Sequence, residues 1–111
     1  MRWLVLLLLA GCASEPYWQR TKEPLPVYVV KAVPDETTLR RMCRQTHLSW
    51  EQTLNGCTAR LDGFAVIFYR TNRQPWEVGC TLRHERAHAA GWMHDDRTAF
   101  STDCGPKEFK E

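Results

Sequence analysis

One segment decides the fold and the chemistry of this 111-residue chain, and it reads His84-Glu85-Arg86-Ala87-His88-Ala89-Ala90-Gly91-Trp92-Met93-His94. On a helix, residues four apart lie one turn apart on the same face, so His84 and His88 can point two imidazoles at one metal ion. Glu85 is rotated by about 100° from His84, which lets its carboxylate reach a water molecule bound to that ion. Gly91 tolerates the left-handed conformation that ends a helix, and the resulting turn can bring His94 round as a third imidazole.

Three neutral imidazoles and one open position are the ligand set of a catalytic zinc site. Three of the four histidines in the chain lie in this segment, and the fourth, His47, has no comparable neighbours. Two other ligands remain open: a thiolate from Cys80, four residues before the first histidine, and the carboxylate of Asp95 in place of the third. Asp95 or Asp96 can also accept the outer N–H group of a ligand histidine. We expect one zinc ion per chain, with the ligands His84, His88 and His94.

These eleven residues resemble the zinc-binding signature of the metzincin branch of zinc metallopeptidases. The resemblance implies hydrolysis of peptide bonds in a peptide or protein substrate, with the three histidines as zinc ligands and Glu85 as general base and acid. It also implies a reduced zincin-like domain in which an edge strand near the metal binds an extended peptide. Metzincins carry a methionine turn beneath the metal, and no methionine follows His94 in this chain.

Two other functions remain open. The chain can be a non-catalytic zinc-binding lipoprotein of the cell envelope that serves in assembly or binding. It can also be a zinc hydrolase that acts on peptidoglycan peptides. The retained Glu85 argues for an enzyme, because a structural zinc site has no use for that carboxylate.

The N-terminus resembles a bacterial lipoprotein signal. Arg2 precedes the apolar run Trp3–Leu9, which is too short to span a bilayer, and Leu9-Ala10-Gly11-Cys12 resembles a lipobox. The resemblance implies a signal peptide over 1–11, a lipid on Cys12 as membrane anchor, and a location in the cell envelope, at the outer membrane facing the periplasm. An ordinary secretory signal with an unrelated cysteine is the alternative.

Charge and cysteine content limit the partners and the compartment. Removal of residues 1–11 leaves fourteen Lys and Arg against thirteen Asp and Glu, so we expect no nucleic-acid partner. Four cysteines remain after lipidation, an even number that suits the oxidising compartment of an exported protein. Three pairings are possible, and we favour Cys43–Cys57 and Cys80–Cys104 because both close local loops.

The rest of the pattern predicts a small α+β domain over 27–111, behind a flexible tether over 12–26 that has no periodicity. Residues 27–33 are rich in valine and predict a strand, and a helix is expected after the cap residue Asp35. Two strands over 57–61 and 64–69 flank Asp62-Gly63, a tight hairpin turn. One strand of this hairpin is the candidate substrate-binding edge. The metal helix follows and ends near Ala90, so we expect a few-stranded sheet with one backing helix and one active-site helix.

Overall fold

The computed structural model describes residues 18–43, 55–94 and 103–111. Its elements are β1 (Trp18–Arg20), β2 (Val27–Val33), α2 (Glu36–Cys43), β3 (Gly56–Arg60), β4 (Phe64–Arg70), α3 (Pro75–Ala89) and β5 (Trp92–His94). They form two small sheets and two helices, which confirms the predicted α+β class. Within the described residues, no helix has both the length and the apolar character needed to cross a bilayer. The predicted signal peptide, Cys12, His47, Asp95 and Asp96 lie outside these residues.

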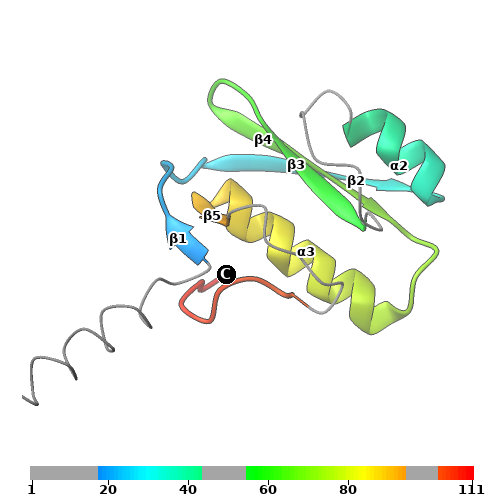
Figure 1. Ribbon diagram of the computed structural model, residues 1–111. Coiled ribbons are helices and arrows are strands. Elements are labelled where there is room, and N and C mark those ends of the chain that lie inside the picture. The colour runs from blue at the N-terminus through cyan, green and yellow to red at the C-terminus, as the bar shows by residue number, and fades with distance from the viewer. Residues whose placement is uncertain (1–17, 44–54, 95–102) are drawn as a thin grey trace, which may run out of the picture.

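The main sheet has the strand order β2-β4-β3 (Figure 1). β3 and β4 form the predicted antiparallel hairpin, in which the N–H of Leu61 donates to the carbonyl of Phe64 at 2.8 Å. Gly63 in the turn has a φ of +81°, a conformation that glycine adopts at low cost. β2 pairs with β4 in parallel, so β4 is the central strand and β2 and β3 are its two edges.

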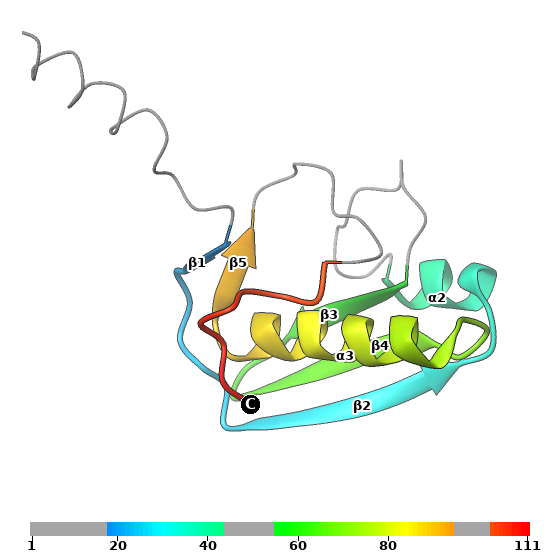
Figure 2. The ribbon, with the colours of Figure 1, turned by 90° about the horizontal axis from the view of Figure 1, so that it is seen from below.

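Alternating side chains of the sheet pack against helices on opposite faces. On one face, α2 buries Leu39 and Cys43 against Val33 and Cys57, and Cys43 forms a disulfide with Cys57. On the other face lies α3, which packs along the sheet (Figure 2). Its Ala89 joins a cluster of buried residues with Ala65 and Ile67 of β4. Small side chains on α3 let the helix approach the sheet closely, which fixes the position of the helix that carries His84 and His88.

β1 and β5 form a separate two-stranded antiparallel sheet, with Trp18 opposite His94. The prediction of a flexible tether over 12–26 is therefore wrong for Trp18–Arg20. Contacts with a distant part of the chain order this short segment, because β5 supplies its main-chain partners and Trp18 is only 9% exposed. The chain beyond it is also held, because the N–H groups of Thr21 and Lys22 both donate to the carbonyl of Gly91.

Gly91 connects α3 to β5 and is needed for two reasons. Its φ is +99°, in the left-handed region, as the sequence predicts. A Cβ atom at this position would also lie 2.1 Å from the carbonyl oxygen of Lys22, a main-chain atom that cannot move independently. The absence of a side chain thus allows the N-terminal segment to dock beside the end of the metal helix.

Replacing Gly91 by alanine tests this docking, and Gly63→Ala is the matched control. Both glycines have positive φ, but a Cβ at Gly63 meets no atom within 4 Å. We expect Gly63→Ala to lower the free energy of unfolding by about 1–2 kcal/mol, the cost of the left-handed conformation. Gly91→Ala should cost at least ~3 kcal/mol, because a clash with the main chain is added. Urea unfolding of the oxidised proteins measures both, and equal costs would contradict the docking role.

Candidate metal centre

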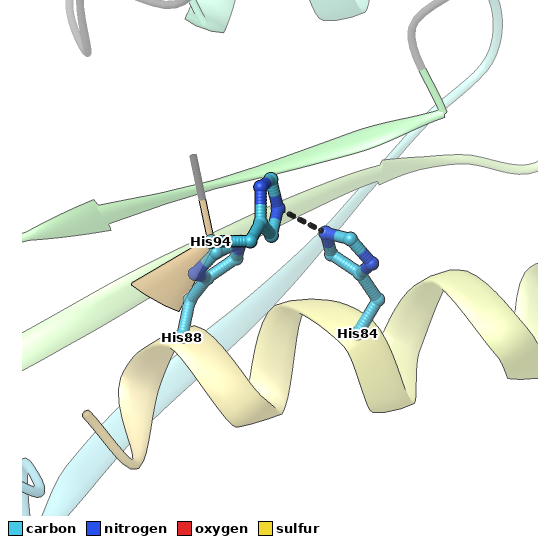
Figure 3. A group of neighbouring side chains, drawn as sticks. All are labelled: His84, His88 and His94. Atoms are coloured by element: carbon cyan, nitrogen blue, oxygen red, sulfur yellow. Dashed lines mark hydrogen bonds between the residues drawn. The ribbon is translucent and has the colours of Figure 1, made fainter. Parts of the chain in front are cut away.

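His84 and His88 project from one face of α3, and His94 reaches them from β5 (Figure 3). The Nε2 atoms of His84 and His94 are 3.2 Å apart. One ligand atom from each of the three residues lies within 4.8 Å of those from the other two, so the group could hold a metal ion. The turn at Gly91 brings the third histidine back, as the spacing of the segment predicts.

Hydrogen bonds to main-chain carbonyls orient the two helix histidines. The Nδ1 atom of His84 lies 2.9 Å from the carbonyl oxygen of Asp103, and that of His88 lies 2.9 Å from the carbonyl oxygen of Trp92. A carbonyl only accepts, so each neutral ring carries its proton on Nδ1. The Nε2 atom of each ring is left with a lone pair, which is the form that a metal ion requires.

The C-terminal segment that supplies the Asp103 carbonyl is attached to α3 by two kinds of bond. Cys80 forms a disulfide with Cys104, the second of the favoured pairs. The guanidinium group of Arg83 donates to the carbonyl oxygens of Cys104, Pro106 and Phe109 at 2.6–2.9 Å. Since Asp103 directly precedes the bridged cysteine, these bonds set the position of its carbonyl beside His84.

Trp18 is in contact with all three histidines. Its ring centroid lies 4.9 Å from that of His84, 5.1 Å from that of His88 and 4.5 Å from that of His94. Its indole N–H donates to a carboxylate oxygen of Asp103 at 3.2 Å, and the N–H of Gly105 donates to the same oxygen at 3.0 Å. One buried ring from the N-terminal strand thus packs the triad and ties it to the C-terminal segment.

The electrostatics of the site differ from one group to the next. Burial lowers the pKa of His88 to about 4, even though the nearby charge of Glu85 acts in the opposite direction. Burial alone would also lower the pKa of His84, but the hydrogen bond to Asp103 and the charge of Glu85 raise it above its ordinary value. Burial opposes ionisation of Asp103, yet hydrogen bonds from His84 and Gly105 lower its pKa to about 2. His88 is therefore unprotonated on its inner nitrogen at neutral pH, whereas His84 holds a second proton more strongly than an ordinary histidine does.

Glu85 lies beside the triad and is not part of it. It is 6% exposed, and its Oε2 atom is 3.9 Å from the Nε2 atom of His84. Its Oε1 atom accepts a hydrogen bond from the hydroxyl of Thr58 on β3 at 2.8 Å. A buried carboxylate is thus held close to a nitrogen that faces the metal position, beyond hydrogen-bond distance from it.

Sequence reasoning finds the histidines and Glu85 but misses three of their partners. Thr58 shares the α3-facing side of β3 with Gly56 and Arg60, so strand alternation combined with the correct helix packing can indicate it. Trp18 and Asp103 are 85 residues apart in the chain, and no local pattern relates them. Cys80 is bound in a disulfide, which removes it as a thiolate ligand.

Comparison of the chain with protein-family models, with curated proteins and with solved structures finds no match. The assignment of a function therefore depends on the chemistry of these residues.

The Cys80–Cys104 bond is expected to support metal binding. In the double variant Cys80→Ser/Cys104→Ser, the Asp103 carbonyl loses its covalent attachment to α3, and affinity for Co²⁺ should fall about 10- to 100-fold. The matched control is Cys43→Ser/Cys57→Ser, on the opposite face of the sheet, which should keep its Co²⁺ affinity within about threefold. Both should lose roughly 3 kcal/mol of stability on the loop-entropy model. Equal Co²⁺ affinities in the two variants, measured by absorption titration, would contradict the role of the Asp103 carbonyl.

Metal binding should weaken as the pH falls, because the ion must displace a proton from His84. The pKa of His84 lies above 6.5 and that of His88 is about 4. Below the pKa of His84 the ion must displace one proton from that ring, while His88 needs no such step above about pH 4, so affinity should drop by up to about tenfold per pH unit between pH 6 and 5. Competition with a chelator of known pH dependence measures it. A constant affinity over this range would show that His84 is not a ligand.

Proposed function

We propose that this chain is a zinc-dependent peptidase, anchored by a lipid on Cys12 in the cell envelope, at the outer membrane facing the periplasm. The observation that carries the proposal is the convergence of three imidazoles beside one buried carboxylate, Glu85. A site that only stabilises a fold is closed by four protein ligands. Here three histidines form the group within the described residues, which leaves a fourth position for water or substrate.

The donor set suits zinc. Zinc is about 2.0–2.1 Å from imidazole nitrogens, and two nitrogens in tetrahedral geometry are then about 3.3 Å apart. The Nε2 atoms of His84 and His94 are 3.2 Å apart, so these two rings need little movement to bind one ion. Neutral nitrogen donors also disfavour magnesium and calcium, which prefer oxygen ligands.

Glu85 is in position to act as general base and then as general acid. When bound, zinc supplies a water molecule whose pKa is lowered from about 15.7 toward about 7, and it polarises the scissile carbonyl. The Glu85 carboxylate accepts the proton of the attacking water and delivers it to the leaving amine as the C–N bond breaks. The Nδ1 atoms of His84 and His88 stay hydrogen-bonded to the main-chain carbonyls and keep the two rings oriented.

The edge strand β3 is the place where a substrate would bind. It carries Thr58, which contacts Glu85, and among the strands that the structure describes it has a neighbour on one side only, in the order β2-β4-β3. An extended peptide can add to such an edge through main-chain hydrogen bonds. This supports a peptide or protein as the substrate class. A peptidoglycan peptide is the alternative substrate, and the experiment below tests it as well.

Glu85→Gln tests the proposal directly. The variant should bind one zinc ion with unchanged affinity, since Glu85 is not a ligand, but its hydrolysis of a mixed peptide library should fall about 10²- to 10⁴-fold. Glu108→Gln, an exposed acidic residue of the C-terminal segment, is the matched control and should keep full activity. Peptide products are quantified by mass spectrometry with and without a chelator, and peptidoglycan fragments are tested in parallel.

Two outcomes would refute the proposal. Zinc-loaded protein that cleaves neither substrate class would favour the non-catalytic envelope lipoprotein. Undiminished turnover in Glu85→Gln would remove this residue from its role.

A further inference from the structure

Two residues on the side of β3 that faces α3 lie next to the side chain of Glu85. Side chains two residues apart on a strand share a face, which places Gly56 and Thr58 together against the helix. A Cβ atom on Gly56 would lie 3.3 Å from Cγ of Glu85, 2.7 Å from Cγ2 of Thr81 and 2.9 Å from the carbonyl oxygen of Phe68. The contacts with Thr81 and the Phe68 carbonyl require a glycine at position 56, and the stem of Glu85 passes close beside that glycine.

Thr58 binds the carboxylate at the end of that stem. Its hydroxyl lies 2.8 Å from Oε1 of Glu85 and 3.1 Å from the main-chain carbonyl of the same residue. A hydroxyl has one proton to donate, and the nearer acceptor is the carboxylate oxygen. The ionised carboxylate is also the stronger acceptor. The proton is thus shared mainly with Oε1, which leaves Oε2 directed to His84, 3.9 Å from its Nε2 atom.

We propose that Thr58 is a positioning residue for Glu85: its hydroxyl holds one carboxylate oxygen so that the other faces the water to be deprotonated. The inference deepens the proposed peptidase function and rests on it. A carboxylate on a flexible Glu side chain has several rotamers, and only those that face the metal position are productive. The hydrogen bond from Thr58 favours one of them before any substrate binds, and Gly56 leaves space beside the stem.

Thr58→Val is the decisive variant, because it removes the hydroxyl and keeps the shape of the side chain. We expect kcat for peptide hydrolysis to fall about 10- to 100-fold while KM stays within about twofold, since orientation of the base is lost and substrate binding is not. Zinc affinity should remain within threefold. Thr58→Ser restores the hydroxyl and should keep kcat within about threefold of the native value.

The matched control is Thr81→Val, the same chemical change at a buried threonine one helical turn before Glu85. It should leave kcat within about twofold. A loss of kcat in Thr81→Val equal to that in Thr58→Val would mean that general damage to the helix–sheet interface explains both, and it would overturn the proposal.

Two further readouts separate this inference from the proposed function. Binding of acetohydroxamate to the zinc-loaded protein needs a proton acceptor beside the metal, so Thr58→Val should weaken it about tenfold and Thr58→Ser should not. In crystals of the metal-free variants, the Glu85 carboxylate should move away from the native position in Thr58→Val alone.

If the native protein hydrolyses no peptide, the peptidase proposal fails. The hydroxamate affinity and the position of the Glu85 carboxylate still test whether Thr58 positions Glu85. An unchanged carboxylate position in Thr58→Val, or an unchanged kcat in an active enzyme, would overturn the positioning role.

Discussion

The hydrogen bonds from two imidazole Nδ1 atoms to main-chain carbonyls are the constraint on which the site depends. Each bond places the ring proton on the outer nitrogen and turns the inner nitrogen of His84 or His88 toward a common centre. Main-chain acceptors are set by the fold itself, so ring orientation here depends on the course of the backbone around Asp103 and Trp92. This explains why a disulfide, an arginine that binds three carbonyls and a glycine turn all lie within one short stretch around α3.

Three parts of the chain that are far apart in sequence converge at this centre. α3 and β5 supply the three histidines that could hold a metal ion, the C-terminal segment supplies a carbonyl and a carboxylate, and β1 supplies an indole ring. Trp18 contacts all three ligands and Asp103 at once, so the two-stranded sheet is a part of the metal site and not an accessory to it.

The local elements of the fold follow from the sequence because local physics determines them. The alternation around Asp62-Gly63 gives the hairpin, and the spacing of His84 and His88 gives the helix and the two-ligand face. The parallel pairing of β2 with β4 and the strand at Trp18–Arg20 were not foreseen. Both depend on partners distant in the chain, and a three-residue strand has no periodicity from which it could be predicted. For the same reason Thr58 and Asp103 become visible as neighbours of Glu85 and His84 only when the packing of α3 is known.

The docking of Trp18 against the triad has a consequence for where the protein can act. Trp18 follows Cys12 by six positions in the chain, and six fully extended residues span only about 20 Å. If Cys12 carries the proposed lipid, the histidine site next to Trp18 stays close to the membrane surface. It would work in a thin layer next to the bilayer, so bond choice would be governed as much by how near a target lies to the membrane as by its amino-acid sequence.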